Sequence, residues 1–307
     1  MVQGALRLIL EPIFEADFSK YSYGARPGRS AHEAIAEVRT GLMYQKHLVV
    51  DVDLKSFFDD IRHDRMLEKV ARRVEDGQVL ALIKQFLKST GDKGVPQGSP
   101  LSPLLANVAL NDLDHILGRG FGFITYVRYL DDMVVLTYDS YRGRKWAGRA
   151  LERIRKEAEA IGVSLNTDKT RVVTLTEPDT SFAFLGFDIR WQPNPTIHKG
   201  YPHTCPRRKA VINVLRNVRD TLRHSQHLPV RDAVARVNQV VRGWVNYFRR
   251  GNSSRTFDVV RTAVEKKVRR YAVKKRKRKG FGWTRWSSAV VYGTWGLFDD
   301  YQVRYQG

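Results

Sequence analysis

Apolar and polar positions alternate in two different ways along the chain, and the change divides it into two parts. In the first part, residues 48–58 form an apolar, β-branched run that ends in acidic residues, which predicts a buried strand. Residues 124–138 form two similar arms around Leu130-Asp131-Asp132, which predicts a hairpin. Helical spacing of apolar residues predicts helices over 33–41, 64–88, 104–117 and 144–161. This mixture favours an α+β fold, with an antiparallel sheet flanked by helices.

A proline-rich segment ends this first part. Residues 192–208 contain four prolines, which interrupt helices and central strands. Beyond this segment, helical spacing predicts three helices, over about 209–224, 230–250 and 256–275. We therefore expect a first domain over residues 1–198 and an all-α second domain over residues 199–307.

Charge distinguishes the two parts more sharply than the apolar pattern does. The chain has a net charge of +21, and residues 199–307 contain 26 Lys and Arg against 6 Asp and Glu, whereas residues 1–198 contain 27 against 26. Such a field attracts polyanions. A solvated charged tail would also account for it, but aromatic residues such as Trp244, Phe257 and Trp283 lie between the basic ones. That interleaving favours a folded surface that binds nucleic acid.

Composition excludes several other classes of protein. With 42% hydrophobic residues and six Trp, the chain can bury a core and is not disordered. The single cysteine, Cys205, excludes a disulfide framework and a Cys-based zinc site. We expect no signal peptide, because the first residues lack a basic n-region and a small-residue cleavage site, and the sequence contains no apolar run of roughly 20 residues. We expect a cytoplasmic protein without a membrane segment.

Acidic residues stand at two points where a buried strand or a hairpin turns. Asp53 follows the apolar run, and Asp131 and Asp132 lie at the hairpin tip. Carboxylates in an apolar setting are costly unless something pairs with them, and Mg²⁺ is a suitable partner because it prefers hard oxygen ligands. An Asp-Asp pair is otherwise an ordinary turn. Spacing does not choose between Asp51 and Asp53, because they share one face of the strand.

Five segments occur in an order and at distances typical of one family. They are Asp51–Asp59 (DVDLKSFFD), Gly94–Pro103 (GVPQGSPLSP), Tyr129–Asp132 (YLDD), Leu165–Thr170 (LNTDKT) and Phe184–Phe187 (FLGF). A further stretch, Tyr23–Ser30 (YGARPGRS), fits the same pattern. Together they resemble the reverse transcriptases of the group II intron type. The resemblance implies a polymerase palm with partial fingers, followed by a basic all-α thumb and maturase domain.

The resemblance also implies roles for individual residues of the first domain. Asp53, Asp131 and, more peripherally, Asp132 would hold two Mg²⁺ ions, with Mn²⁺ as the alternative, and Asp51 would be structural. The nucleotide and substrate would be bound by Phe57, Pro96, Gln97, Gly98, Tyr129 and Lys169. The primer grip would consist of Phe184, Leu185 and Gly186.

Some of these roles have a second interpretation. Phe57 would exclude the 2′-hydroxyl of a ribonucleotide or else pack in the core. Lys169 would meet the departing pyrophosphate or stay solvated. Arg26 and Arg29 would contact phosphates or pin the loop that Gly28 turns.

The second domain resembles the maturase region that follows the polymerase in intron-encoded proteins, on the segment Val241–Phe248 (VRGWVNYF). Its basic residues are expected to contact phosphates, and they are Lys266, Lys267, Arg269, Arg270, Lys274, Lys275, Arg276, Lys277, Arg278 and Lys279. Its aromatic residues would build a helical core rather than stack on bases. The implied partners are a group II intron RNA or another structured RNA, an RNA template with a DNA primer, and deoxynucleoside triphosphates.

The sequence departs from the family pattern in its fingers, its hairpin and its end. A fingers segment with a Lys/Arg pair that grips the triphosphate normally precedes the equivalent of Val2 and Gln3, and we expect it to be missing here. Leu130 stands where alanine is commoner, and no metal-bound nuclease module is expected. Two alternatives to a working RNA-directed DNA polymerase therefore stay open. One is an RNA-binding splicing cofactor with an idle palm, and the other is a fragment of a longer reverse transcriptase, including the CRISPR- and defence-associated types.

Overall fold

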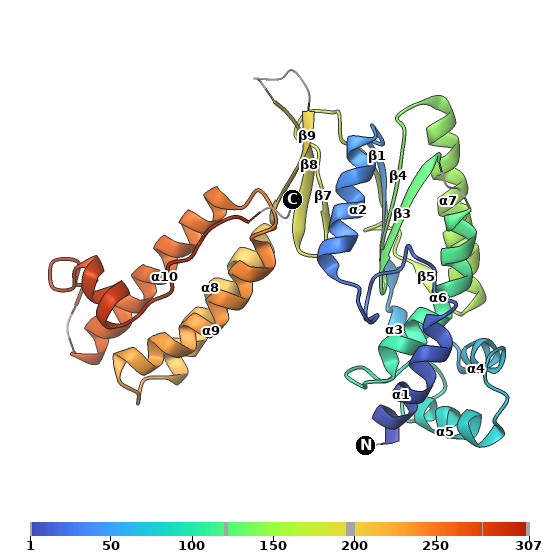
Figure 1. The fold of residues 1–307 in the computed structure, drawn as a ribbon, viewed down its shortest axis with the longest axis horizontal. Coiled ribbons are helices and arrows are strands. Elements are labelled where there is room, and N and C mark those ends of the chain that lie inside the picture. The colour runs from blue at the N-terminus through green and yellow to red at the C-terminus, as the bar shows by residue number, and fades with distance from the viewer. Residues whose placement is uncertain (1, 120–121, 195–199, 278, 305–307) are drawn as a thin grey trace. The chain divides into compact units, whose positions relative to one another are not determined.

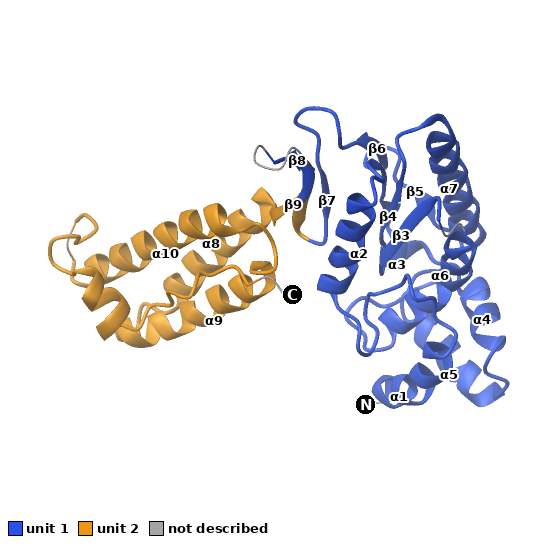
Figure 2. Cartoon of the chain, turned by 45° about the horizontal axis from the view of Figure 1, so that its top comes forward, with its two compact units in different colours: residues 1–185, 191–202 blue, residues 186–190, 203–307 orange. Residues whose placement is uncertain are grey.

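The chain divides into two compact units in the computed structural model, which describes residues 2–119, 122–194, 200–277 and 279–304 (Figure 2). The first unit contains residues 1–185 and 191–202, and the second contains residues 186–190 and 203–307. The predicted boundary between residues 198 and 199 lies outside the described residues. None of the described helices is long and apolar enough to cross a membrane.

The first unit combines helices with a central antiparallel sheet (Figure 1). Its described helices are α1 (Val2–Glu15), α2 (Ala31–Met43), α3 (Phe57–Asp60), α4 (His63–Ala71), α5 (Gly77–Lys88), α6 (Ser102–Gly118) and α7 (Tyr141–Ala160). Its described strands are β1 (Leu48–Val52), β2 (Leu54–Lys55), β3 (Ile124–Tyr129), β4 (Asp132–Thr137), β5 (Ser164–Leu165), β6 (Arg171–Thr174) and β7 (Phe182–Phe184). The predicted α+β class is confirmed.

The central sheet has the strand order β3-β4-β1-β6, and helices α2 and α7 lie on either side of it (Figure 1). Strand β1 lies between β4 and β6, and both pairings are antiparallel. The side chains of Leu48, Val50 and Val52 are buried in the main apolar core together with residues of α6 and α7. Because side chains alternate along a strand, Asp51 points to the face opposite these three. Strand β1 therefore holds Asp51 on the face opposite the core, and Asp53 follows directly after its end.

Two predicted elements differ from the observed ones. The strand predicted over residues 48–58 is instead two strands, β1 and β2, which end at Val52 and Lys55. Ser56 then adopts a left-handed backbone (φ 46°), and the chain turns into α3. The helical stretch 64–88 is split into α4 and α5, since the Asp76 side chain accepts hydrogen bonds from Gln78 N and Val79 N and starts a new helix.

A smaller sheet has the order β7-β8-β9, with β8 at Phe187–Pro193 and β9 at Gly200–Pro206. The division between the two units runs through β8 and β9. The second unit then contains the helices α8 (Arg208–His224), α9 (Val230–Phe248) and α10 (Ser254–Lys275), and a π-helical turn at Ala289–Thr294. The three predicted helices of the second part are confirmed.

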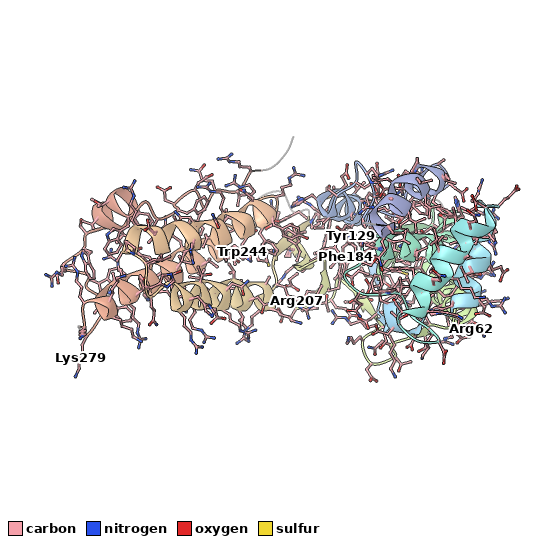
Figure 3. The ribbon with its side chains drawn as sticks, turned by 90° about the horizontal axis from the view of Figure 1, so that it is seen from below. Arg62, Tyr129, Phe184, Arg207, Trp244 and Lys279 are labelled. Carbon is pink, nitrogen blue, oxygen red and sulfur yellow. The ribbon has the colours of Figure 1, made fainter. Side chains whose placement is uncertain are left out.

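The helices of the second unit pack through apolar residues at helical spacing. Val218 on α8, Val237 on α9 and Val264 on α10 are each fully buried. Trp244 packs against Phe257, with ring centroids 5.7 Å apart. Figure 3 shows Trp244 among the helices of this unit and Lys279 at one end of it. Most aromatic residues here therefore build the core, and the basic side chains cover the outside.

Candidate active site and nucleic-acid interface

Sheet register brings together acidic residues that lie about 80 positions apart in the sequence. In the antiparallel pair of β1 and β4, Val52 pairs with Met133. Asp53 directly follows the first of these residues, and Asp132 directly precedes the second. Tyr129 pairs with Asp132, which leaves Leu130 and Asp131 as the two turn residues of the hairpin. Asp53, Asp131 and Asp132 therefore share one end of the sheet.

The closeness of these carboxylates affects their pKa values. Burial raises the pKa of the Asp131 carboxyl, and the charge of Asp53 raises it further. Desolvation by neighbouring protein atoms, followed by the charges of Asp131, Asp51 and Asp53, raises the pKa of Asp132 to about 6, although part of its side chain is exposed. Like charges have this effect only at short range. The acidic group thus holds more negative charge than its own surroundings neutralise.

Two cations lie beside the group. Lys169 Nζ is 3.5 Å from Asp53 Oδ2, and the Lys side chain is 67% exposed, so it is free to move away. Arg171 Nε is 3.2 Å from Asp51 Oδ2 across the β1–β6 pair. Asp51 is thus held within the sheet by a strand neighbour, whereas Asp53 stands at its edge.

The donor set suits a hard divalent cation, because it consists of carboxylate oxygens with surplus negative charge. However, in the part of the chain that the structure describes, no group of three or more His, Cys, Asp or Glu side chains is placed so that it could hold a metal ion. The residues fit such an ion in chemistry and charge. They do not form a closed set of ligands around one point.

A buried ion pair supports the hairpin tip, and sequence analysis missed it. Arg128 and Asp114 are both fully buried, and their closest side-chain atoms are 2.5 Å apart. Arg128 also donates hydrogen bonds to the carbonyl oxygen of Leu130 (2.9 Å), Ser22 Oγ (2.8 Å) and Asn107 Oδ1 (3.0 Å). One guanidinium thus holds the turn that carries Asp131. An arginine inside an apolar strand was the available sequence signal, since a buried charge requires a partner.

The segment that contains Gly24 packs directly against the same turn. Tyr23 N donates to the carbonyl oxygen of Arg128 (2.9 Å), and Asn107 Nδ2 donates to that of Gly24 (2.9 Å). A Cβ at Gly24 would lie 2.5 Å from Leu130 N. Only glycine therefore fits between this segment and the turn.

Arg26 has a structural role in this segment, which corrects its predicted contact with phosphates. The residue is 9% exposed, and its guanidinium binds the Glu15 carboxylate at 2.7 Å and the carbonyl oxygens of Ser19 and Ser22. These contacts use its donors inside the protein. Arg29, which is half-buried, lies over the ring of Tyr23 at 5.3 Å.

The predicted nucleotide-binding residues divide into exposed and buried ones. Gln97 and Gly98 lie on an exposed loop, where Gln97 Nε2 donates to Asp59 Oδ1 at 3.0 Å, and Pro96 and Tyr129 are half-buried. Phe57 is only 2% exposed and packs in the apolar core, which is the second of its two predicted roles. The ring of its neighbour Phe58 lies 5.2 Å from the Phe57 ring, centroid to centroid. Phe58 is half-buried and is therefore the one of the two rings that can reach a ligand.

The predicted primer grip is the turn between β7 and β8. Phe184 is 3% exposed, so its side chain packs inside and cannot contact a primer. Leu185 (φ 47°) and Gly186 (φ 81°) have left-handed backbones that form the turn. Any contact at this place therefore comes from the turn backbone or from the half-buried Leu185 side chain, and not from the Phe184 ring.

Most of the predicted basic residues of the second unit face solvent. The exposed ones are Lys266, Arg270, Lys274, Lys275, Arg276, Lys277 and Lys279, and Lys267 is half-buried. Arg278 lies outside the described residues. The predicted contact of Arg269 with phosphates is wrong, because the residue is 1% exposed and its side chain pairs with Glu265 at 2.8 Å. Its guanidinium also lies 4.3 Å from the centre of the Trp283 ring, so it contributes to the core.

Comparison with known proteins agrees with this arrangement. Residues 1–189 match the family "Reverse transcriptase (RNA-dependent DNA polymerase)", and residues 211–289 match "Group II intron, maturase-specific domain". The chain is 30% identical over 235 residues to Protein YkfC of Escherichia coli, an alignment that covers 61% of this chain and 59% of that protein. It is 36% identical over 123 residues to the group II intron-encoded protein LtrA of Lactococcus lactis, covering 37% and 20% of the two chains.

A solved structure of telomerase from Candida albicans is also similar, with 12% identity, a TM-score of 0.49, and coverage of 96% of this chain and 56% of that one. The chain therefore spans at most about three fifths of the length of each of these proteins.

Proposed function

Because the chain belongs to the reverse transcriptase family of the group II intron type, we propose that it synthesises DNA on an RNA template and also binds a structured intron RNA. The observation that carries this proposal is the meeting of Asp53, Asp131 and Asp132 at one end of the central sheet. We assign the polymerase to residues 1–198 and the RNA-binding thumb to residues 199–307.

Reverse transcriptases generally use a divalent metal ion, and we assign Asp53, Asp131 and Asp132 as the residues that hold it here. Two Mg²⁺ or Mn²⁺ ions held by these carboxylates would supply the chemistry that activates a primer 3′-hydroxyl and stabilises a leaving pyrophosphate. Desolvation, followed by repulsion from the neighbouring carboxylates, raises the pKa of Asp132 to about 6, and a bound cation would relieve the repulsion. Binding of the cation is therefore favoured above about pH 6, where Asp132 is ionised.

The other residues of the site position the nucleotide. Lys169, 3.5 Å from Asp53, is placed to neutralise the triphosphate or the departing pyrophosphate. Gln97, with Pro96 and Gly98 shaping its loop, contacts the incoming nucleotide. Phe58 takes the place first given to Phe57, as the ring beneath the sugar.

The second unit grips nucleic acid through its exposed cations. Seven exposed lysines and arginines between positions 266 and 279 face solvent, and each phosphate contact releases counterions. We propose that its ligands are the intron RNA and the RNA template with its DNA primer, in a cytoplasmic ribonucleoprotein. Affinity then falls steeply as salt rises.

Primer extension on an RNA template tests the catalytic assignment. Asp131→Asn keeps the size of the side chain but removes its charge, and we expect extension to fall by at least about 10²-fold, as when a stabilising group is removed from an active site. Asp92→Asn, at an exposed loop position, is the matched control and retains activity. Equal extension by all three proteins would remove the assignment.

A second candidate function is RNA binding with an idle palm, as a splicing cofactor. The observation in its favour is the lack of a closed metal-ligand group among the described residues. In that case Asp131→Asn leaves RNA affinity and intron splicing unchanged, and the wild-type protein extends no primer. Reversal of the charges at Lys274, Lys275 and Lys277 abolishes RNA binding under either function.

A further inference from the structure

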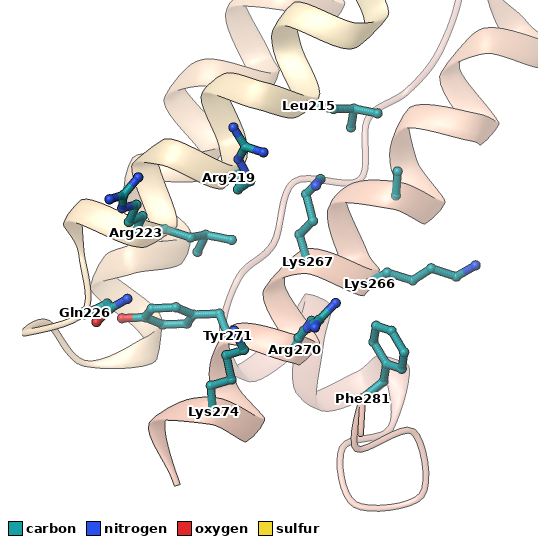
Figure 4. Close-up of a pocket in the computed structure, with 12 residues that line it drawn as sticks. Leu215, Arg219, Arg223, Gln226, Lys266, Lys267, Arg270, Tyr271, Lys274 and Phe281 are labelled. Carbon is teal, nitrogen blue, oxygen red and sulfur yellow. The ribbon is translucent and has the colours of Figure 1, made fainter. Parts of the chain in front are cut away.

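A groove runs between α8 and α10 in the second unit, and it combines a rim of cations with apolar and aromatic walls (Figure 4). Its volume is about 680 Å³, within the range of roughly 300–1,000 Å³ typical of ligand sites. Arg219 and Arg223 reach it from α8, and Lys266, Lys267, Arg270 and Lys274 reach it from α10. None of the described residues that line it is acidic.

These cations are largely uncompensated. Within the described residues, the one ion pair among them joins Arg219 Nε to the adjacent Asp220 at 3.4 Å, and both of its side chains are well exposed. Such an exposed pair contributes little. The rim of the groove therefore has nearly its full positive charge available for phosphates.

The groove also has apolar and aromatic walls. Leu222 and the ring of Tyr271 are buried within it, and the Tyr271 hydroxyl donates to the carbonyl oxygen of Ser225, so that the ring forms part of the wall. Phe281, on the segment after α10, is 39% exposed and is another of the residues that line the pocket, beside Lys266 and Arg270 (Figure 4). An exposed aromatic ring beside a row of cations suits a planar base whose phosphates lie outside it.

We propose that this groove binds an unpaired segment of RNA, with a base against Phe281 and the backbone phosphates on the two rows of cations. A duplex would present its phosphates while its bases stayed stacked inside, so it would not use the apolar wall. All the residues that line the groove lie within 211–289, the part that matches the maturase-specific domain, and RNA is therefore the strand to which we commit. The inference rests on the proposed binding of RNA by the second unit and does not depend on polymerase activity.

Fluorescence anisotropy with a short unpaired RNA, the same sequence as a duplex, and the same sequence as single-stranded DNA tests the proposal. We expect Phe281→Ala to weaken binding of the unpaired RNA roughly 5- to 150-fold, the loss that corresponds to one stacked base. Duplex affinity stays within about twofold. Phe281→Trp restores the affinity for unpaired RNA.

A charge-matched pair of double variants tests the cations. Arg219→Gln with Arg223→Gln lowers the slope of log affinity against log salt by about 1.4, since two phosphate contacts on a single strand are lost. Arg231→Gln with Arg236→Gln removes the same charge from α9, at exposed positions that do not line the groove, and changes the slope by less. Circular dichroism confirms that each variant is folded.

Several outcomes would overturn the proposal. Equal losses for unpaired RNA and duplex, or no effect of Phe281→Ala, would show that no base enters the groove. Equal slopes for the two double variants would show that the groove has no special place in binding. Equal affinity for single-stranded DNA would refute the commitment to RNA. Asp131→Asn is expected to bind unpaired RNA normally, so loss of polymerase activity and failure of the groove are measured separately.

Discussion

The buried pair of Arg128 and Asp114 gives the sharpest test of how the hairpin tip is held. Arg128→Met keeps much of the apolar length of the side chain but removes the charge and all the hydrogen bonds of the guanidinium. Asp114 is then left fully buried without its cation, and among the side chains that the structure describes only the Tyr126 hydroxyl, at 2.8 Å, still donates to it. The carbonyl oxygen of Leu130 loses its donor as well.

The size of the effect follows from these contacts. Removing one partner of a buried ion pair costs about 3–5 kcal/mol, because the other charge stays buried and uncompensated. We therefore expect Arg128→Met to lower the free energy of unfolding of the first unit by about that amount. Adding Asp114→Leu removes the stranded charge. The double variant should recover part of the loss, with a coupling free energy above about 1 kcal/mol.

Urea unfolding followed by circular dichroism measures this loss, with Arg155→Met as the control. Arg155 is half-exposed on α7 and makes only a 3.8 Å pair with Glu152, so its loss should change stability by less than about 0.5 kcal/mol. Equal stabilities of Arg128→Met and Arg155→Met would refute the reasoning.

A second readout separates positioning from stability. Arg128→Lys keeps the charge but not the forked donors that reach Leu130, Ser22 and Asn107 together. We expect it to lower kcat of primer extension more than it raises KM, at a temperature where it remains folded. An unchanged kcat would show that the pair stabilises the fold without positioning Asp131.

Other predictions concern the turn, the carboxylates and the second unit. Gly24→Ala should destabilise the protein by roughly 1–3 kcal/mol and reduce primer extension, because the new Cβ would lie 2.5 Å from a backbone nitrogen of the turn. Gly148→Ala, in open space on α7, is the control and should stabilise the protein by up to about 1 kcal/mol in the same urea titration. The folded protein holds the Asp132 proton more tightly than the unfolded chain does, so without metal the free energy of unfolding should fall as pH rises from about 4 to about 6. Asp132→Asn should remove that part of the pH dependence in unfolding titrations. Arg269→Gln should lower the melting temperature of the second unit without changing the salt slope of RNA binding in anisotropy, whereas Lys266→Gln should reduce the slope at unchanged stability.

Much of the architecture was predictable from local patterns. Helical spacing gave α8, α9 and α10 within about two residues, and the apolar arms around Leu130 gave the β3–β4 hairpin. These elements depend on contacts between residues near one another in sequence, which are readable from periodicity. The family blocks likewise identified Asp53 and the hairpin aspartates as one group.

Local pattern did not decide which side of an element a residue faces in the folded protein. Phe57 and Phe58 are adjacent and chemically identical, yet the chain that leaves the left-handed turn at Ser56 buries the first in the core and leaves the second half-buried. Arg269 stands among exposed cations, and its burial depends on Glu265 and on the later segment that contains Trp283.

By itself, then, the sequence determined the family, the α+β class, the helices of the second unit and the concentration of positive charge there. Tertiary structure alone decided that Arg128 pairs with Asp114, that Asp53 stands beside Asp132, and that cations of α8 and α10 face one groove. The physical reason is that each of these depends on strand register or helix packing between distant segments. A shift of one residue in that register would reverse the face on which every side chain of the strand lies.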